Sequence, residues 1–202
     1  MNTGDARTEI MRSIRAHLAL SAPFDGREPR INTNACKSVA PSVVVSVVDD
    51  FKHNLEAVDG HCLIARNELE VKAALAGITE GKRIATSDEP PSTKDLFNFD
   101  VGITRAQAGI AETGTLVLDS AIERNRLVSL VPPIHIAILD ASKIYATLGE
   151  TLAMLQSVNE LSPAITFITG PSRTADIELT LTVGVHGPQE LHVIIVEPEP
   201  NN

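Results

Sequence analysis

The amino-acid composition of this chain limits its core almost entirely to aliphatic side chains. Its 202 residues include no Trp, one Tyr and five Phe, yet 43% of them are hydrophobic. Val, Ile, Leu and Ala must therefore fill the interior, as is common where parallel strands are buried on both faces. The length is that of one domain and is sufficient to bury a full core.

Short aliphatic runs alternate along the chain with segments of helical periodicity. The alternation predicts right-handed βαβ crossovers, and hence an α/β protein with an open, mostly parallel sheet flanked by helices. Thr113-Gly114 predicts a tight connection between two further short strands, 110–112 and 115–118. We expect helices over 41–58 (where a run of valines also fits a strand), 68–78 and 143–158, and strands over 61–65, 83–86, 100–104, 135–139, 164–169 and 191–196.

The pattern along the chain predicts three parts. Residues 1–40 comprise a short amphipathic helix over 5–20, with an aliphatic residue at every fourth position, and a Pro-containing tether without periodicity. Residues 41–197 form the domain, and residues 198–202 are a tail rich in Pro and Asn.

The charge and the opening residues exclude several classes of protein. The net charge is −9, with 26 acidic and 17 basic residues, which argues against general binding to nucleic acid or to an anionic membrane. The first twenty residues carry charges and lack the apolar centre of a secretory signal, and no stretch is apolar over the length of a bilayer. We therefore expect a cytoplasmic protein.

Cys36 and Cys62 are the only cysteines. They predict no disulfide framework, and an iron–sulfur cluster held by this chain alone would need about four such ligands. No pair of histidines has the spacing of a helical zinc site, so no bound metal is predicted. If the protein takes part in electron transfer, the metal centres must belong to other subunits.

The first candidate site segment is Gly109-Ile-Ala-Glu-Thr-Gly-Thr115, followed directly by an aliphatic run. Glu112 fits a general base, a nucleophile or an anchor for a substrate hydroxyl, and burial beside apolar neighbours would raise its pKa. The alternative, which the local sequence favours, is a turn carboxylate that accepts from the amides of Thr113, Gly114 and Thr115.

The second candidate segment is Gly170-Pro-Ser-Arg-Thr-Ala-Asp-Ile-Glu178, which follows a predicted strand. Gly170 permits close approach of a ligand, Ser172 and Thr174 offer hydroxyls, and Arg173 suits a carboxylate or phosphate. The alternative is a capped turn whose Arg pairs with a nearby acid. Asp176 and Glu178 share one face on a strand but diverge on a helix or turn.

His135 and His186 are the candidate proton-transfer groups among the six histidines. His135 follows Pro132-Pro133 and opens an aliphatic run, and His186 lies in the turn-rich sequence Gly184-Val-His-Gly-Pro188. Either imidazole could exchange a proton near neutral pH. A lone His among apolar residues is also often a hydrogen-bonded structural group.

Taken together in this order, these blocks and the stretch from Arg124 and Arg126 to His135 resemble the LUD domain family, in its single-domain LutC/YkgG type. The resemblance covers roughly residues 40–197. It implies a fold like that of the NagB/RpiA/CoA-transferase superfamily, and a subunit without clusters of its own that acts with two iron–sulfur proteins in oxidising L-lactate to pyruvate. Matching the family motif are Glu112, Thr113, Gly114, Thr115, His135, Gly170, Ser172, Arg173, Thr174, Asp176, Glu178 and His186.

Three functional hypotheses follow. In the first, the chain is a component of an L-lactate dehydrogenase (oxidoreductase) complex, and its pocket binds a small carboxylate or an organic cofactor. Glu112, His135 and His186 then handle a proton, Arg173 and the amides near Ser172 hold the anion, and electrons leave through partner clusters. The alternatives are a stand-alone enzyme acting on a sugar phosphate or acyl-CoA, and a non-catalytic scaffold subunit.

Overall fold

The computed structural model describes residues 8–9, 11–13, 16, 46–123, 125–157, 162–174, 182–183 and 187–197. The chain divides into two compact units, residues 1–40 and 41–202. In the first unit every described residue is helical, within the helix predicted over 5–20. The predicted tether and the tail lie outside the described residues.

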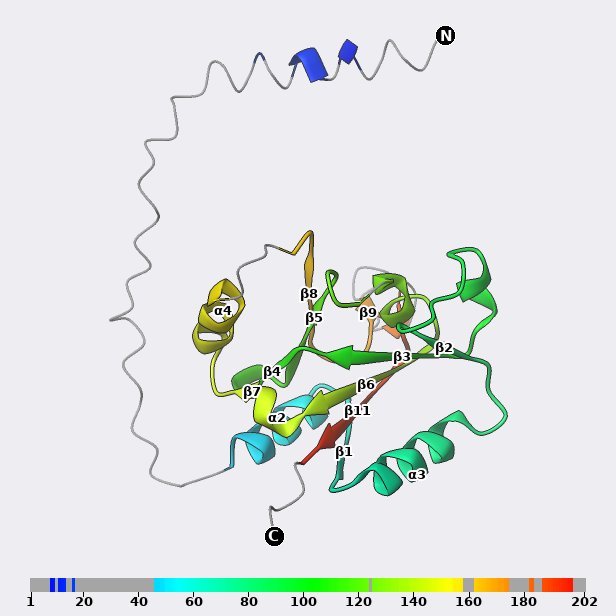
Figure 1. The fold of residues 1–202 in the computed structure, drawn as a ribbon, viewed down its shortest axis with the longest axis vertical. Helices are drawn as coiled ribbons and strands as arrows, with labels where there is room; N and C mark the ends of the chain where they lie inside the picture. The colour runs from blue at the N-terminus through cyan, green and yellow to red at the C-terminus, as the bar shows by residue number, and fades with distance from the viewer. Residues whose placement is uncertain are drawn as a thin grey trace. The chain divides into compact units, whose positions relative to one another are not determined.

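Five parallel strands form the main sheet of the second unit, in the order β1-β11-β6-β3-β2 (Figure 1). The mostly parallel sheet predicted from the alternation of elements is therefore present. Its strands are β1 (His61–Ala65), β2 (Ile84–Thr86), β3 (Val101–Ala106), β6 (Ile134–Asp140) and β11 (Glu190–Val196).

Helices cover both faces of this sheet. On one face, α3 (Glu68–Thr79) packs Val71, Ala74, Leu75 and Ile78 onto a cluster that includes Ile136 and Ile194. On the other, α2 (Val47–Glu56) packs Phe51 and Leu55 into the main core. Both helices begin as their sequences direct, because Ser46 and Asn67 accept hydrogen bonds from amides of the first turn.

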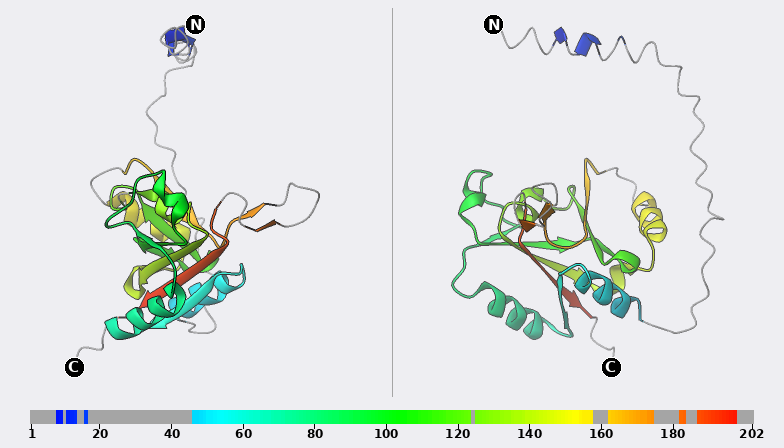
Figure 2. Two further views of the ribbon diagram at one scale, coloured as in Figure 1. Left: turned by 90° about the vertical axis from the view of Figure 1, so that its right-hand side faces the viewer. Right: turned by 180° about the vertical axis from the view of Figure 1, so that it is seen from behind.

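A second sheet of four strands, β7-β4-β5-β8, packs across the α2 side of the first (Figures 1 and 2). β4 pairs antiparallel with β5, and β5 antiparallel with β8. A separate short ribbon, β9 (Arg173–Thr174) with β10 (Thr182–Val183), projects from the body of the domain (Figure 2). The second sheet comprises β4 (Ala108–Ile110), β5 (Thr115–Asp119), β7 (Ile144–Tyr145) and β8 (Ile165–Ile168).

The helix predicted over 143–158 is shorter than expected. Ile144 and Tyr145 form β7, which pairs in parallel with β4, and α4 runs only over Leu148–Ser157. Pairing with β4 outweighs the helical spacing of Ile144, and Thr147 starts the helix by accepting from the Glu150 amide at 3.2 Å. Val158 lies outside the described residues.

The strand expected over 110–112 also ends early. β4 stops at Ile110, and a 3-10 turn, η3 (Ala111–Thr113), follows. The Gly114 amide closes this turn by donating to the Ala111 carbonyl (3.3 Å), and the Glu112 amide donates to the Ala146 carbonyl (3.1 Å). Three further 3-10 turns are η2 (Asp95–Asn98), η4 (Arg126–Ser129) and η5 (Ala141–Lys143).

No helix among the described residues is long and apolar enough to cross a membrane.

Candidate functional site

The cleft between the two sheets, here the His135 cleft, has a volume of about 250 Å³. It opens between β8 on one side and the amino ends of β6 and β11 on the other. Its described lining contains no charged side chain, so hydroxyls, backbone groups and one imidazole supply all its polarity. Six of its lining residues are Ser129, His135, Thr166, Thr169, Ser172 and Leu191.

His135 is a buried, titratable residue in the lining of this cleft. Its side chain is 1% exposed, and Nε2 lies 2.8 Å from Oγ1 of Thr104. Nδ1 is buried and has no hydrogen-bond partner within the part of the chain that the structure describes. Burial lowers the pKa of the imidazole from 6.5 to about 4, because the charged form loses its hydration, so the ring is neutral at pH 7.

The neighbouring strands explain how His135 reaches this place. It pairs in register with Gly102 of β3 and Leu191 of β11. A side chain at position 102 is excluded, because its Cβ would lie 1.9 Å from the Val128 carbonyl oxygen. The turn η4 can therefore pack directly on β3, and it brings the buried Ser129 to the cleft, where its hydroxyl donates to the Arg126 carbonyl (2.7 Å).

The second candidate segment borders the same cleft through its first residues. Gly170 has a positive φ of 91°, and this turn carries the chain from β8 past the cleft. The Ser172 amide donates to the Pro188 carbonyl at 2.8 Å. Gly187 packs so close that a Cβ there would lie 3.1 Å from Cβ of Ser172.

The first candidate segment lies on the opposite face of the β5–β8 pair, in a second hollow of about 460 Å³ between α4 and β8. We call it the α4 groove, lined by Ile110, Glu112, Thr113, Thr115, Leu148, Leu152, Phe167 and Thr169. The two hollows share only Phe167 and Thr169.

Three threonine hydroxyls form a row at the polar end of the α4 groove. Oγ1 of Thr115 lies 2.7 Å from Oγ1 of Thr113 and 2.6 Å from Oγ1 of Thr169. Antiparallel pairing of β5 with β8 makes this contact, so the two candidate segments meet where Thr115 touches the residue before Gly170. Sequence reasoning had singled out Thr113 and Thr115 but missed Thr169.

Glu112 also borders the α4 groove, and its carboxylate has a structural partner. Oε1 accepts from the backbone amide of Leu148 at 2.7 Å, at the first residue of α4. A carboxylate at a helix N-terminus is stabilised by the unpaired amides there. Glu112 therefore links the turn after β4 to α4. Its partner Leu148 lies 36 positions further along the chain, whereas the turn amides considered above are its immediate neighbours.

Gly114 is required by packing against α2. Its φ is 63°, and a Cβ there would lie 2.3 Å from the backbone nitrogen of Leu55. The Asn54 side chain donates to the carbonyl of Ala111 in the same turn (2.8 Å). This glycine holds the motif turn on the helix, and it does not line either hollow.

The structure places Arg173 away from both hollows. Its Nη2 donates to the Val58 carbonyl at 2.8 Å and forms an ion pair with the exposed Asp59. It borders a third, open hollow of about 780 Å³ together with His61 and His192. Arg173 thus pairs with an acid, but that acid is 114 positions away in the chain, and Arg173 itself begins strand β9 instead of a helix.

The structure describes little or nothing of the remaining candidates. Thr174 is in β9, but only its backbone is described, and Asp176, Glu178 and His186 lie outside the described residues. Among the described residues, no group of three or more His, Cys, Asp and Glu side chains could hold a metal ion. Cys62 is buried, which raises the pKa of its thiol to about 11 and keeps it protonated.

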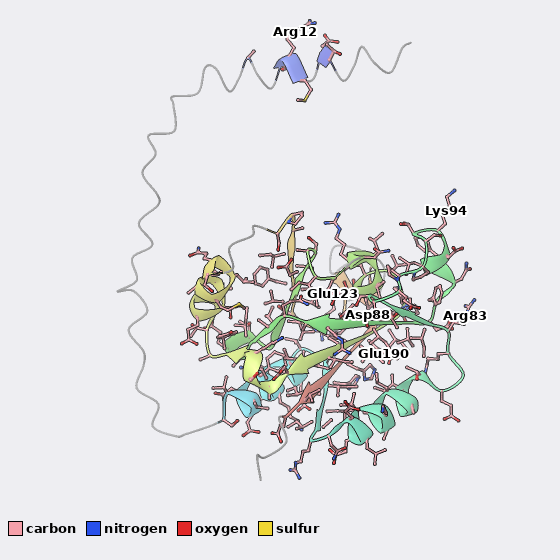
Figure 3. All side chains as sticks on the ribbon, in the orientation of Figure 1. Arg12, Arg83, Asp88, Lys94, Glu123 and Glu190 are labelled. Carbon is pink, nitrogen blue, oxygen red and sulfur yellow. The ribbon has the colours of Figure 1, made fainter. Side chains whose placement is uncertain are left out.

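A buried carboxylate that sequence reasoning missed belongs to Glu123. Only 4% exposed, it accepts from the Arg105 amide (3.0 Å) through Oε1, while Oε2 has no partner among the described residues (Figure 3, beside β3). Thr104 was likewise missed. Both residues lie away from the glycine-rich and proline-rich turns that distinguished the other candidates in the sequence.

The fold and the His135 cleft define an α/β protein in which a small, uncharged polar cleft lies between a parallel sheet and a mixed one. The LUD domain family profile matches residues 91–196, just over half of the chain, and this protein belongs to the LUD domain family. The matched region extends from the segment before β3 to the end of β11, and it contains every candidate site residue.

Several curated relatives align with this chain. An uncharacterized protein of Neisseria meningitidis serogroup B is 44% identical over 108 residues, or 53% of this chain and 46% of that protein. The lactate utilization protein C of an Exiguobacterium species is 33% identical over 153 residues, 73% of this chain and 66% of its own. That of Halalkalibacterium halodurans is 40% identical over 123 residues, 59% and 50% of the two chains. The alignments thus span about half to two thirds of these relatives.

One solved structure resembles the fold. A DUF162 family protein from Deinococcus radiodurans superposes with a TM-score of 0.61, covering 77% of this chain and 99% of that chain. The sequence identity is 23%, so this similarity concerns the arrangement of strands and helices.

Proposed function

We propose that this chain acts in lactate utilization, as the subunit without clusters of its own in a complex that oxidises L-lactate to pyruvate. Relatives that carry the name lactate utilization protein C support the pathway. The observation that carries the choice of site is the buried, unpaired Nδ1 of His135 in a small cleft. A buried polar atom without a partner is costly, and a ligand that supplies the missing partner accounts for its presence.

The His135 cleft suits a small hydroxy acid in size and in polarity. At about 250 Å³ it is smaller than the pockets that enclose drug-sized ligands. The ligand carboxylate accepts hydrogen bonds from hydroxyls such as those of Thr166 and Ser172, and no acidic side chain of the described lining repels it. Neutral donors bind a carboxylate less strongly than Arg, so we expect modest affinity.

His135 is the residue we assign to the hydroxyl proton. With its hydrogen on Nε2, the ring donates to Thr104, and Nδ1 keeps a lone pair that can accept the proton of the substrate hydroxyl once the groups that cover this buried atom move aside. A pKa of about 4 makes free His135 a weak base, and a bound carboxylate raises this pKa by stabilising the imidazolium. Conversion of lactate to pyruvate releases two protons and two electrons. One proton would go to His135 and the other to solvent, and iron–sulfur clusters on two partner proteins would supply the acceptor for the two electrons.

The other candidates take supporting roles in this proposal. Glu112 lies across the β5–β8 pair and caps α4. Arg173 would have to exchange its partner Asp59 for a ligand before it could hold an anion. Because that ion pair is largely exposed to solvent, such an exchange costs little.

The test measures lactate-dependent dye reduction by the complex reconstituted with its iron–sulfur partners. His135→Gln should lower the rate by about 100-fold or more, the usual contribution of a positioned acid–base group. His53→Gln, at an exposed position of α2, is the matched control and should leave the rate unchanged. A wild-type rate for His135→Gln would overturn the assignment and favour a scaffold role for the chain.

Thermal shift of the isolated chain separates the proposal from a stand-alone enzyme. L-lactate and pyruvate should raise the melting temperature of the wild type, and of His53→Gln, but not of His135→Gln. Stabilisation by a sugar phosphate or by coenzyme A, without any by lactate, would replace lactate utilization with one of those substrate classes.

A further inference from the structure

The α4 groove has a second set of features that the proposed function does not use. Its walls are apolar, formed by Ile110, Leu148, Leu152 and Phe167, and its polar groups gather at one end. Its volume of about 460 Å³ lies within the range of small-molecule sites, which are mostly apolar with a few placed polar groups.

The apolar walls are only partly covered by the protein itself. Phe167 and Leu148 are each 43% exposed, and Leu152 is 39% exposed. Leu148 and Leu152 are one helical turn apart on α4, whereas Met154 and Leu155 of the same helix pack onto β4 and β5. Leu155 lies on the same side of α4 as Leu148 and Leu152, so the helix has one broad apolar face, of which the part at Leu148 and Leu152 is left along the groove.

The polar end is rich in hydrogen-bonding groups and carries a single charge. Thr113, Thr115 and Thr169 form the row of hydroxyls, and Glu112 has Oε1 on the Leu148 amide, which leaves Oε2 to accept from a ligand. No Lys, Arg or His belongs to the described lining. An anionic ligand would meet the carboxylate without a compensating cation, so the groove disfavours anions.

We propose that the α4 groove binds a flat ring compound that has no negative charge and carries an O–H or N–H donor. The ring lies against Phe167, Leu148 and Leu152, and the donor reaches Oε2 of Glu112. Stacking on an aromatic ring adds to the burial of apolar area, and a donor to a carboxylate forms a charge-assisted bond. This site lies on the opposite face of β8 from the His135 cleft, and its occupancy does not depend on the proposed function.

Three probes with the same ring system test the charge preference: 1-naphthol, 1-naphthoate and 1-naphthylmethylamine. The chain has no Trp, so the fluorescence of the naphthalene ring can be followed directly in titrations of the full-length protein. We expect 1-naphthol and 1-naphthylmethylamine each to bind at least about tenfold more tightly than 1-naphthoate. Absent binding of 1-naphthol, or tighter binding of the anion than of either other probe, would overturn the proposal.

Matched variants locate the probe. Leu152→Ala and Phe167→Ala should each weaken 1-naphthol about tenfold, while Leu69→Ala and Phe97→Ala, both at positions 77% exposed, should not. Glu112→Gln keeps an oxygen for the Leu148 amide but removes the charge, so the preference for naphthol over naphthoate should fall at least about threefold.

Two outcomes separate this site from the His135 cleft. His135→Gln should leave 1-naphthol affinity unchanged, and a saturating concentration of L-lactate should not displace the probe. Equal binding by wild type and Leu152→Ala, with circular dichroism showing that both are folded, would contradict the placement in the groove.

Discussion

The His135 cleft and the α4 groove lie on opposite faces of the β5–β8 pair, and they differ in what their polar groups do for the fold. In the groove, Oε1 of Glu112 already has a bond, to the first amide of α4. In the cleft, Nδ1 of His135 is buried and has no hydrogen-bond partner among the described residues. A hydrogen-bonding capacity that the fold leaves unused is therefore stronger evidence for chemistry than proximity to a glycine-rich motif.

The largest effect is expected where the motif turn meets α2. Gly114→Ala should destabilise the protein by about 4 kcal/mol, from the left-handed φ and the overlap of Cβ with the Leu55 backbone. Gly81→Ala is a matched control, since Gly81 has a φ of 69° but no atom near its Cβ, and should cost about 1 kcal/mol. Urea unfolding at pH 7 measures both, and equal losses would show that α2 does not hold the turn.

The second-largest effect is a pH dependence of stability that comes from His135 in the cleft. His135 has a folded pKa of about 4 against 6.5 in the unfolded chain, so the unfolded state binds more protons between these values. Stability contributed by neutral His135 is complete above pH 6.5 and falls by about 3 kcal/mol as pH drops to 4. Urea unfolding across this range should show the loss in wild type and in His53→Gln, and a much smaller loss in His135→Phe. An identical pH profile for His135→Phe would contradict the burial of this ring.

A smaller effect concerns the row of hydroxyls that separates the two hollows. Thr115→Val keeps the shape of the buried side chain but removes its bonds to Thr113 and Thr169, and should cost about 1.5 kcal/mol. Thr113→Val removes one bond at the exposed end and should cost less than half as much. If the two variants were equally stable, the row would contribute nothing to joining β5 and β8.

The smallest effect tests whether Glu112 acts mainly as a helix cap. Glu112→Ala should lose about 1 kcal/mol by urea unfolding, because the Leu148 amide loses its acceptor, while Glu112→Gln should lose only a few tenths. Should Glu112→Gln instead abolish lactate-dependent dye reduction at unchanged stability, the proton-transfer role would pass from the cleft to the groove.

The parallel sheet could be predicted because its strands are short continuous aliphatic runs, such as 191–196, bounded by breakers. The second sheet could be predicted only in part, because strands were expected near β4, β5 and β8 but a helix was expected at β7. β7 is two residues long, and its Ile144 has the spacing of a helix until its pairing with Gly109 is known. A contact between residues thirty-five positions apart leaves no local signal, and it moved the start of α4 to Leu148.

The site shows the same division between local and long-range information. Strand-end positions and residue types were enough to select Glu112, Thr115 and His135 as candidates. Whether their polar atoms have partners depends on Leu148, Thr169 and Thr104, which come from other parts of the chain. Sequence could therefore suggest that two segments meet, but not that β8 would separate a cleft from a groove.

Nuclear magnetic resonance of the protein with ¹⁵N-labelled histidine rings tests the central claim most directly. At pH 7 the His135 ring should be neutral, and its Nδ1 resonance should move as L-lactate is added, while the exposed His53 stays unchanged. A protonated His135 at pH 7, or an Nδ1 resonance that does not move at the highest lactate concentration, would contradict the assignment of the His135 cleft as the ligand site.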